Sequence, residues 1–550
     1  MKFVPRDTPD FTPFLSQPPW LSALLRLRGI TDEAEARRFL SPTLEDLHNP
    51  FLLPGMQKAV DLLKEAISSR DPILVWGDYD ADGVCASAIL LETLREEGAL
   101  VSCHLPSRQE EGYGLNEAGV REAAASSVKL LITVDCGISN VDEVALARSL
   151  GMKVIVTDHH TLPPVLPEAD VLMNPLLGDY PFPSLCGAGV ALKLCHALQG
   201  QQGLEKRLDL AAIATVADVV PLLGENRVIV REGLIRIQAS PRPGVRAMLA
   251  SAAVAPPLRS EHLAFRIGPR LNAAGRLSSA SLAQELLLTR DPLRAEQLAR
   301  DLEALNARRQ SLEREMTASA LSQAQALPSF SSARSLVVAG EGWNPGLVGL
   351  TAGRLCEKFY RPAVALSVSG DTAVGSCRSI PGVNIFEVLS RCEDLLVRFG
   401  GHAQAAGLTL QTDRIEAFRA RLDQVIRESS DESVFTRQLV YDLEVPFRVW
   451  TPETLETLSL LEPTGYGNPA PVFLLPAAQV QSMRRVGRDL SHLQMSLLTE
   501  GLLVKGIAFS QGEHADKGYS RVDLLYRPIL NEFRGRVSVE AQVQALLPSQ

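Results

Sequence analysis

The most informative segment of this chain is Pro72-Ile-Leu-Val-Trp-Gly-Asp-Tyr-Asp-Ala-Asp-Gly83. Its apolar first half is typical of a strand that is buried on both faces of a parallel sheet. Asp78, Asp80 and Asp82 follow, and an extended backbone would point their carboxylates to the same side. Such like charges repel one another unless a cation lies between them. The stretch therefore favours a divalent metal site, with a solvated Asp-Gly turn as the alternative.

Composition is that of an ordinary globular protein with several domains. The chain has 550 residues, of which 46% are hydrophobic and 22% are charged, which is enough for more than one core. A net charge of -9 excludes a protein that binds nucleic acid through overall positive charge alone. Any nucleic-acid site must therefore be a local basic patch or a metal centre.

The cysteines and the apolar runs point to a cellular compartment. The eight cysteines contain no Cys-x-x-Cys pair, which indicates reduced thiols and neither a disulfide framework nor a zinc site. The first residues lack the apolar core of a signal peptide, and no apolar run approaches membrane-spanning length. We expect a cytoplasmic protein.

Strand-like and helix-like segments alternate from about residue 72 to residue 222. This alternation predicts a parallel α/β sheet with helices on both faces. The predicted strands are short and mostly rich in β-branched residues, and they comprise 73–76, 100–105, 130–134 and 153–157. The predicted helices between them comprise 87–97, 117–125 and 141–150.

The rest of the chain predicts a long helix, a second α/β unit and a barrel. Residues 292–327 have the composition of one helix, which Asp291 and Pro292 start and Pro328 ends. The second unit has predicted strands at 335–339, 363–368 and 372–379 and a helix at 346–359. Short strands that suit a small β-barrel follow at 472–476, 493–498, 503–509, 522–526 and 536–543.

These patterns predict five parts of the chain. We expect a helical N-terminal segment, a catalytic α/β domain, a connecting helix, a second α/β domain and an OB-like barrel, in the ranges 1–50, 51–290, 291–328, 329–428 and 429–550.

Further metal-competent residues follow the predicted strands. Asp135 comes directly after one strand, and His159 and His160 come after the next. Ligands of open α/β sheets bind beyond the carboxyl ends of the strands, so these side chains should meet the first three aspartates at one edge. Asp218 is the single charge in an apolar stretch, and a buried carboxylate needs a partner.

Mixed carboxylate and imidazole ligands favour Mn²⁺ or Mg²⁺, and Mn²⁺ tolerates histidine better. So many ligands predict two ions that share a carboxylate, which is the usual arrangement for phosphoester hydrolysis. Taken singly, Asp135 could cap a helix, His159 could be a core histidine and Asp218 could pair in a buried salt bridge. Their occurrence at adjacent strand ends favours the metal site.

The order of these motifs resembles the DHH phosphoesterase superfamily. The matching stretches are Asp78-Tyr-Asp-Ala-Asp-Gly83, Thr133-Val-Asp-Cys-Gly137, Asp158-His-His160 and Asp218. Gly400-Gly-His-Ala-Gln-Ala-Ala-Gly407 is similar to the signature of the DHH-associated second domain. From about residue 45 to the end, the chain also resembles the RecJ family of single-strand-specific DNA exonucleases. The segments that carry this second resemblance are 106–115, 185–190, 268–276, 305–310, 343–346 and 462–469.

The resemblance implies a single-stranded-DNA-specific exonuclease. It would degrade DNA from 5′ to 3′ by two-metal catalysis and release mononucleotides in DNA repair and recombination. The implied partners are single-stranded DNA, single-strand-binding protein and a helicase, with no membrane.

The resemblance also implies roles for individual residues. Asp82, Asp135, His159 and Asp218 would hold one ion, and Asp80, Asp135 and Asp78 the second. His160 would face the substrate phosphate or the second ion. The implied catalytic residues are Asp80, Asp82, Asp135, His159, His160 and Asp218.

A 5′-phosphate pocket is implied at Arg108, Ser376 and Arg378. Two guanidiniums and a hydroxyl group suit an anion. The alternative for Arg108 is a surface salt bridge with Glu110 or Glu111.

Three other basic or glycine-rich features are candidate substrate contacts. Residues 400–407 could begin a helix whose N-terminus binds a phosphate, with His402 bonded to the scissile phosphate; close helix packing is the alternative. Residues 268–276 are expected to form a loop that contacts phosphates through Arg270 and Arg276. The candidate groove of the barrel comprises Arg484, Arg485, Arg488 and Lys505.

Two other functions stay open. A phosphoesterase for short oligonucleotides or cyclic dinucleotides would need neither the barrel nor the long helix. A scaffold that binds DNA without cutting it would not need the full set of acids and histidines.

Overall fold

The computed structural model describes residues 2–8, 10–13, 17–108, 110–239, 242–533 and 535–549. Gln109, inside the motif 106–115, lies outside these residues. The chain forms two compact units. The first combines residues from 1–48, 219–231 and 438–550, and the second combines residues from 49–218 and 232–437.

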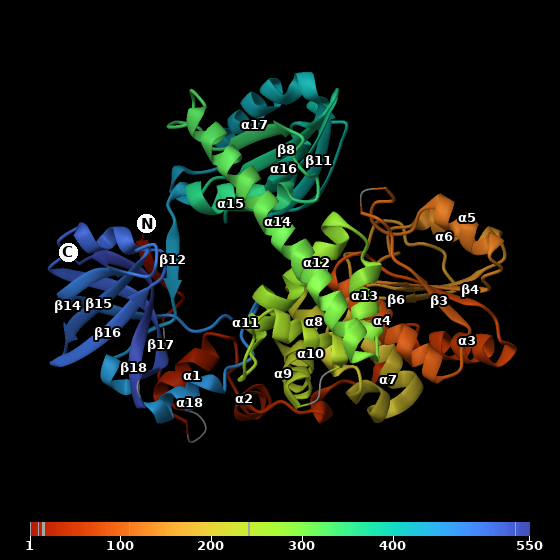
Figure 1. The fold of residues 1–550 in the computed structure, drawn as a ribbon, viewed down its shortest axis with the longest axis horizontal. Helices are drawn as coiled ribbons and strands as arrows, with labels where there is room; N and C mark the ends of the chain where they lie inside the picture. Colours follow the sequence, from red (N-terminus) through yellow and green to blue (C-terminus); the bar gives the residue numbers. More distant parts are fainter. Residues whose placement is uncertain are drawn as a thin grey trace. The chain divides into compact units, whose positions relative to one another are not determined.

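The second unit begins with the predicted parallel sheet, shown in orange at one side of Figure 1. Its strands follow the order β3-β2-β4-β5-β6, and all the pairings are parallel. Their bounds are β2 (Ile73–Trp76), β3 (Val101–His104), β4 (Leu130–Val134), β5 (Lys153–Thr157) and β6 (Val171–Met173). The central strands β2 and β4 are buried along their whole length, which explains their continuous apolar sequence.

The helices that the alternation predicts connect these strands. They are α4 (Ala81–Glu96), α5 (Glu117–Ala125) and α6 (Val141–Ser149), and α3 (Met56–Ser69) precedes the first strand of the sheet. The α4 helix begins six residues earlier than the sequence pattern predicts, because Asp80 caps it: its carboxylate accepts hydrogen bonds from the amides of Asp82 and Gly83.

A helical layer that the sequence patterns did not predict follows the sheet. Its helices are α7 (Gly187–Glu205), α8 (Leu208–Ala217), α9 (Gly224–Ala239), α10 (Pro243–Ser251), α11 (Ser260–His262), η3 (Leu263–Ile267), α12 (Gly268–Leu277) and α13 (Ser281–Leu288). The ten residues of α8 lack an amphipathic pattern because almost all of them are buried. Residues 268–276, which we expected as a loop, belong to α12; this expectation is wrong, since Pro269 stands in the first turn, where proline is well tolerated.

The long predicted helix is α14 (Pro292–Ala326), and the carboxylate of Asp291 caps it by accepting a hydrogen bond from the Leu293 amide at 2.9 Å. It packs on α10 and α12 near its start and on α15 (Val348–Phe359) and β7 (Leu336–Glu341) near its end. The α14 helix thus packs against both α/β parts of the second unit.

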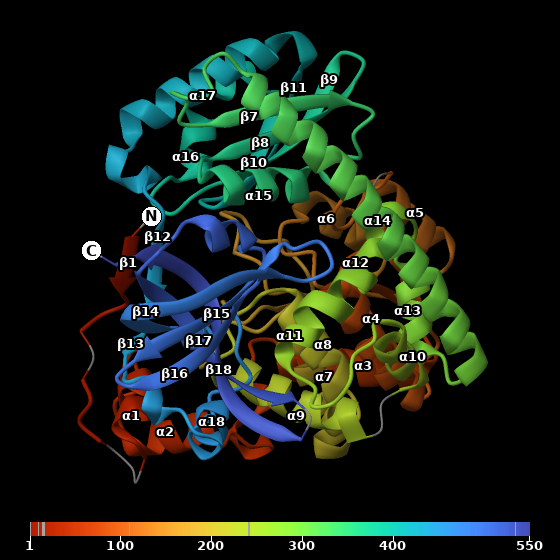
Figure 2. The ribbon, with the colours of Figure 1, turned by 60° about the vertical axis from the view of Figure 1, so that its left-hand side comes forward.

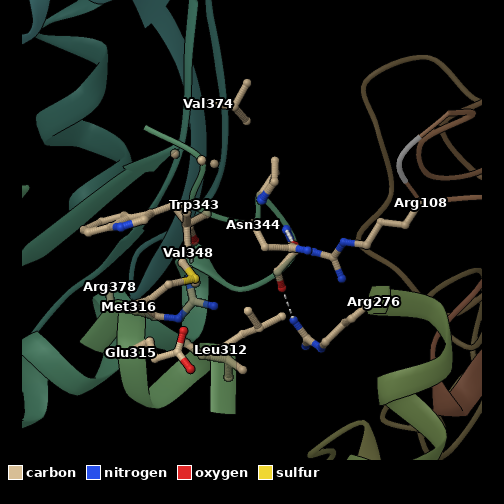
Figure 3. Close-up of a pocket in the computed structure, with 18 of the residues that line it drawn as sticks. Arg108, Arg276, Leu312, Glu315, Met316, Trp343, Asn344, Val348, Val374 and Arg378 are labelled. Carbon is tan, nitrogen blue, oxygen red and sulfur yellow. Dashed lines mark hydrogen bonds between the residues drawn. The ribbon is translucent and has the colours of Figure 1, made fainter. Parts of the chain in front are cut away.

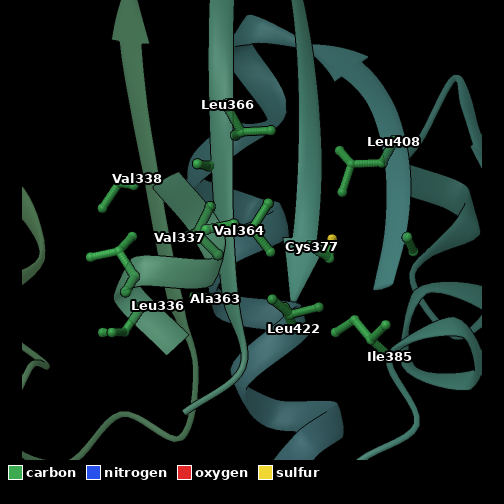
Figure 4. Close-up of a cluster of buried hydrophobic side chains, with 14 of the residues drawn as sticks. Leu336, Val337, Val338, Ala363, Val364, Leu366, Cys377, Ile385, Leu408 and Leu422 are labelled. Carbon is green, nitrogen blue, oxygen red and sulfur yellow. The ribbon is translucent and has the colours of Figure 1, made fainter. Parts of the chain in front are cut away.

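The second sheet has the order β10-β11-β9-β8-β7, in which only β7 and β8 run parallel. The remaining strands are β8 (Ala363–Ser369), β9 (Thr372–Arg378), β10 (Arg398–His402) and β11 (Ala405–Gln411). Figure 4 shows its core, where Val337, Val364, Cys377 and Leu408 from successive strands meet Leu422. The helices on this sheet are α15, α16 (Ile385–Ser390) and α17 (Ile415–Ser429), with short turns η4 (Glu393–Leu395) and η5 (Thr412–Arg414).

The glycine-rich motif 400–407 forms a β-hairpin. In its register His402 pairs with Ala405 and Gly400 pairs with Gly407. The expected helix start is therefore wrong. Gly401 has a φ of 142°, and a Cβ there would meet Ala406 at 2.5 Å, so the tight hairpin requires the glycine.

The first unit is built around the expected barrel. Its strands follow the order β13-β14-β15-β16-β18-β17, and a pairing of β14 with β17 closes the ring (Figure 2). The bounds are β13 (Leu443–Glu444), β14 (Phe473–Val486), β15 (His492–Thr499), β16 (Leu502–Ala508), β17 (Arg521–Phe533) and β18 (Arg536–Pro548). The short helices of this unit are η7 (Phe447–Val449), α18 (Pro452–Ser459) and η8 (Gly512–Asp516). The turn η6 (Glu432–Phe435) belongs to the second unit.

The N-terminal segment joins the barrel unit. Its elements are β1 (Lys2–Pro5), α1 (Pro19–Arg26), α2 (Glu33–Leu40) and η1 (Leu44–Asp46), and η2 (Pro50–Leu52) follows in the other unit. The predicted cap of α2 is present, since Asp32 accepts the Glu35 amide at 2.8 Å. The segment is not wholly helical, because β1 pairs in parallel with β12 (Gln438–Tyr441). The side chains of α1 and α2 share one core with the barrel.

Candidate active site

The loop after β2 holds the first three aspartates close to one another. Asp78 and Asp82 are almost fully buried. Asp80 ends the extended segment and Asp82 lies in the first turn of α4. The expectation of three carboxylates along one extended strand is therefore wrong at its third member, because the helix begins between the second and third aspartates. A tight turn still gathers them, since a Cβ on Gly83 would lie 2.6 Å from the backbone of Asp78.

The start of α7 holds the carboxylate of Asp82. The Gly187 amide donates to its Oδ2 at 2.6 Å and the Ala188 amide donates to its Oδ1 at 2.8 Å. Free N–H groups at a helix N-terminus suit an anion. A Cβ on Gly187 would also lie 2.6 Å from the Cβ of Asp135, so the glycine permits both carboxylates to lie at this helix end.

Three carboxylates among the predicted ligands converge on the imidazole of the fourth. His159 Nε2 lies 3.0 Å from Asp135 Oδ1 and 3.7 Å from both Asp82 Oδ2 and Asp218 Oδ2. Asp218 directly follows α8 and Asp135 directly follows β4. Asp135 has a φ of 61°, a backbone conformation that costs free energy for a residue other than glycine and that occurs often at functional sites.

Burial and mutual repulsion disfavour the charged form of these carboxyl groups. Burial raises the pKa of Asp78 and Asp135 well above the ordinary range, and neighbouring carboxylates raise both further. Burial, with Asp82 and Asp80, raises the pKa of Asp218 to about 9. Burial also lowers the pKa of His159, which favours the neutral imidazole that binds metals.

This donor set fits divalent cations. Ligand atoms of Asp82, His159 and Asp218 lie within 4.8 Å of one another, and so do those of Asp78, Asp80 and Asp135. The buried Oδ1 of Asp78 has no hydrogen-bond partner among the described residues, and an orphaned buried carboxylate oxygen is costly unless a cation meets it. Oxygen donors with one imidazole are the ligands that suit Mn²⁺ and Mg²⁺.

His160 is held by two residues to which the sequence patterns assigned no role. Its Nδ1 lies 2.8 Å from Oδ1 of the fully buried Asp158 and 3.1 Å from the hydroxyl of Tyr113. Burial opposes a charge on His160, but the Asp158 carboxylate outweighs burial and raises the pKa of the imidazole. The position of Asp158 directly before the two histidines could have indicated its role. Tyr113 gave no such signal, because it lies in a loop far from His160 in the sequence.

A basic cavity begins beside these acids. Arg108 and Arg276 line a pocket with Asp78 and Asp80, and both also line a larger cavity of about 1080 Å³ against the second sheet. Figure 3 shows both guanidiniums reaching toward Asn344 at one side of the larger cavity, with Arg378 at the other. The Arg276 guanidinium donates to the Gly346 carbonyl at 2.7 Å. Burial, with Arg108 close by, lowers the pKa of Arg276 to about 10, so an anion in this cavity would relieve repulsion between the guanidiniums.

Ser376 and Arg378 lie in the same cavity, on β9. The Arg378 guanidinium donates to Ser376 Oγ and to the Cys377 carbonyl, both at 2.8 Å. A Cβ on Gly349 would lie 3.0 Å from the Arg378 guanidinium, so the glycine makes room for it. Further lining residues are Arg308, Trp343 and Arg398. Arg308 and Trp343 stand in the segments 305–310 and 343–346, to which sequence reasoning assigned no individual role, and no motif contained Arg398.

Two predicted substrate contacts do not reach these cavities. Arg270 is buried, and its guanidinium donates to Glu303 and to the Arg266 carbonyl, each at 2.6 Å. These donors serve the packing of α12 on α14, and the expected phosphate contact of Arg270 stays a prediction. His402 is exposed on the β10–β11 hairpin and lines neither cavity among the described residues.

The candidate groove residues of the barrel are exposed. Arg484 donates to Gln494 at 2.8 Å, and Arg485 pairs with Asp516. Arg488 and Lys505 are exposed as well. Their role in DNA binding stays a prediction.

Comparisons with known proteins match each α/β part and the barrel. Residues 72–217 match the DHH family, N-terminal domain, residues 333–428 match the DHHA1 domain, and residues 441–545 match the RecJ OB domain. The parallel sheet with its acids and histidines, followed by the second sheet, thus defines a protein of the DHH class.

Comparison with individual relatives identifies the family within this class. The chain is 38% identical to the single-stranded-DNA-specific exonuclease RecJ of Dickeya dadantii, over 98% of this chain and 97% of the relative. It is 37% identical to the Bacillus subtilis RecJ, over 96% of this chain and 67% of the relative. Its fold is similar to that of Thermus thermophilus RecJ in complex with Mn²⁺, with a TM-score of 0.83 and 35% identity. The match covers 96% of this chain and 76% of the Thermus chain. The chain belongs to the RecJ family.

A second structure of the Thermus protein holds Mg²⁺, so both expected metals occur in this family. Within the described residues, none of the helices is long and apolar enough to cross a membrane.

Proposed function

We propose that this chain is a metal-dependent exonuclease that degrades single-stranded DNA from its 5′ end and releases mononucleotides. The observation that carries the proposal is the position of Arg108 and Arg276, which line both the pocket of the acidic cluster and the large basic cavity. A phosphate held by these guanidiniums lies next to the residues that suit two cations.

Two sets of side chains would hold the ions. Asp82, Asp135, His159 and Asp218 would hold one, and Asp78, Asp80 and Asp135 would hold the other. Bound Mn²⁺ or Mg²⁺ would supply an activated water and offset negative charge on the reacting phosphate. The protein positions these ligands beforehand, since α7 fixes the carboxylate of Asp82 and the left-handed backbone fixes Asp135.

His160 would contact the scissile phosphate. The Asp158 carboxylate accepts a hydrogen bond from its Nδ1 and favours the charged imidazolium, which would donate to a phosphate oxygen from Nε2. The Tyr113 hydroxyl contacts the same Nδ1, and its ring packs edge-on against the imidazole, so Tyr113 also limits rotation of the His160 ring.

The basic cavity would bind the 5′ end of the strand. Arg108, Ser376 and Arg378 would hold a terminal phosphate, because two planar guanidiniums and a hydroxyl present several donors to one anion. A terminal phosphate held in this way would place the first phosphodiester of the strand at the metal centre. Attack on this bond would release single nucleotides from the 5′ end.

The barrel would guide the rest of the strand through its exposed basic residues. Single-strand-binding protein and a helicase would supply such strands, in DNA repair and recombination, and these processes would place the chain in the cytoplasm. The boundaries 51–290, 329–428 and 429–550 stay our proposal for the three functional domains, with 1–50 and 291–328 as the N-terminal segment and the connecting helix.

Digestion of end-labelled DNA tests the proposal. A long single strand labelled at either end is incubated with Mn²⁺, Mg²⁺ or a chelator. We expect a 5′ label to appear at once as a mononucleotide and a 3′ label to appear in successively shorter strands, only when a metal is present. Cleavage of very short oligomers alone would instead favour the small-substrate phosphoesterase, and strand binding without cleavage would favour the scaffold.

A further inference from the structure

The loop between β3 and α5 carries two side chains of the proposed active site. Residues 105–116 connect these two elements. Arg108 lines both the acidic pocket and the large cavity (Figure 3), and the hydroxyl of Tyr113 lies 3.1 Å from His160 Nδ1. A surface loop has no strand or helix ladder to hold its backbone. Other contacts must therefore keep these two side chains in place.

The carboxylate of Glu111 is the hub of these contacts. It lies 2.9 Å from Nε2 of His104, the last residue of β3, and it accepts a hydrogen bond from the Ser107 amide at 2.8 Å. It also accepts a hydrogen bond at 3.0 Å from Nδ2 of Asn116, the N-cap residue of α5. Burial disfavours the charged form of Glu111, but these hydrogen bonds outweigh burial and lower the pKa of its carboxyl group. One carboxylate thus joins the end of a strand, the loop and the start of a helix.

Glu111 holds the loop and leaves the guanidinium of Arg108 open to an anion. Sequence reasoning left an ion pair of Arg108 with Glu110 or Glu111 as the alternative, but among the described residues Glu111 pairs with His104 instead. Glu110 contributes its backbone amide, which donates to Ser107 Oγ at 3.4 Å. The Arg108 guanidinium lies over the ring of Tyr79, 5.1 Å from its centroid.

A buried indole connects this hub with the strand that leads to the aspartates. Trp76 is the last residue of β2, two positions before Asp78, and it is 1% exposed. The centroid of its ring lies 4.2 Å from that of the His104 ring, and its Nε1 donates to the Gly114 carbonyl at 3.2 Å. The His104 imidazole therefore joins Glu111 to the strand from which the proposed metal ligands follow.

We propose that Glu111 is a positioning residue, which fixes the loop 105–116 so that Arg108 meets the terminal phosphate of the strand and Tyr113 meets His160. The inference rests on the proposed function and adds to it a residue that acts through others, since Glu111 is not among the residues that line the two cavities. A misplacement of about 1 Å near a reacting centre can cost roughly a hundredfold in rate. A loop that is fixed before the DNA arrives also lowers the entropic cost of binding.

The test compares single strands that carry a 5′ phosphate with strands that carry a 5′ hydroxyl. Full-length Glu111→Ala should lower kcat/KM on the phosphorylated strand roughly ten- to hundredfold, and on the hydroxyl strand less, because Arg108 would contact the terminal phosphate. The ratio of the two values is independent of the fraction of folded enzyme, so a loss of fold alone would not change it. Glu111→Gln keeps the side-chain length and one acceptor oxygen, and its ratio should lie between those of Glu111→Ala and the wild type.

The double variant with Arg108→Ala shows whether Glu111 acts through Arg108. In the Arg108→Ala background, Glu111→Ala should not reduce the preference for a 5′ phosphate any further, because both changes remove the same contact. Effects of the two substitutions on this preference that were fully additive would overturn the positioning role.

Hydrogen exchange tests the hold on the loop without any measurement of activity. A peptide that covers residues 105–116 should exchange faster in Glu111→Ala than in the wild type. Glu110→Ala is the matched control, because it removes the same charge from the same loop, and both its exchange and its kcat/KM should equal those of the wild type. Unchanged exchange in Glu111→Ala would overturn the proposal. If exchange changed as expected but the wild type did not digest single strands, the proposed function would fail and the hold of Glu111 on the loop would stand.

Discussion

His159 Nε2 lies 3.0 Å from Oδ1 of Asp135. One residue follows β5 and the other follows the neighbouring strand β4, so the contact depends on the parallel pairing of the two strands. It places a neutral imidazole and a buried carboxyl group at the point that both proposed cation sites share.

Substitution Asp135→Ala should abolish hydrolysis of single strands and leave their binding within about twofold of the wild type. The reason is that Asp135 is common to both ligand sets, whereas the phosphate-binding arginines are untouched. Initial rates on end-labelled DNA and the Kd in chelator measure the two effects. Asp142→Ala, an exposed acid on α6, serves as control; activity that persisted in Asp135→Ala would contradict the shared-ligand model.

Mn²⁺ should raise the midpoint of thermal unfolding. The buried carboxyl groups repel one another, as the raised pKa values of Asp78, Asp135 and Asp218 indicate, and a cation removes this repulsion. Binding at a hundredfold excess over Kd stabilises the fold by about 2.7 kcal/mol. Differential scanning calorimetry with Mn²⁺ and with chelator measures the shift, which Asp135→Ala should largely lose. Equal midpoints in both conditions would argue against a bound ion.

Gly275→Ala should reduce activity more than it reduces stability. An added Cβ would lie 2.3 Å from the Tyr79 carbonyl oxygen, so the loop that carries Asp78 and Asp80 must move. Displacement of catalytic groups by about 1 Å costs roughly a hundredfold in rate. Gly400→Ala provides the comparison, because nothing lies within 4 Å of a Cβ there. If the kcat of Gly275→Ala equalled that of the wild type, the position of the loop with Asp78 and Asp80 would not limit the rate.

Arg378→Ala should remove the preference for a 5′ phosphate. Loss of a hydrogen bond from a charged group costs about 1.5–3 kcal/mol, which corresponds to roughly ten- to hundredfold in kcat/KM on phosphorylated strands. Strands with a 5′ hydroxyl should be affected much less. Arg354→Ala is the control, since Arg354 pairs with Glu313 and Glu357 outside the large cavity. An equal loss on both substrates would assign Arg378 another role.

Arg242→Met should destabilise the second unit. The Arg242 guanidinium lies between the buried carboxylates of Glu92 and Asp209, at 2.5 Å and 2.8 Å. Removal of one member of a buried ion cluster costs about 3–5 kcal/mol, because Asp209 loses its buried partner and Glu92 keeps only the exposed Arg290. Urea unfolding followed by circular dichroism measures the change. Arg294→Ala breaks an exposed pair with Glu285 and should have no measurable effect.

Local patterns were sufficient for the strands, the caps and most of the candidate ligands. The alternation after Ile73 predicted the sheet, and Asp291 predicted the start of the long helix. Such signals work because a strand or a cap depends on a few neighbouring residues. The helices from α7 to α10 escaped prediction because several of them are buried on more than one side, and a buried helix has no amphipathic period.

Local patterns could not predict side-chain roles that depend on partners distant in the sequence. Arg270 and Arg276 stand in one motif, yet Arg270 serves Glu303 and Arg276 faces the cavity. Their separation by six positions puts them on different sides of α12, and this matters only because the segment is helical. Tyr113 reaches His160 for a comparable reason, through loop geometry that no periodicity encodes.

Local sequence patterns were enough to identify the residues that can bind metal and to place most of them at the ends of strands, because charge, donor type and local periodicity are properties of neighbouring residues. Which of these residues meet depends on the packing of distant elements. Asp82 reaches His159 through a helix and not through an extended strand, and α7, more than a hundred residues away, supplies the amides that hold its carboxylate. Contacts of this range depend on how whole elements pack, and packing is set by all the buried surfaces together.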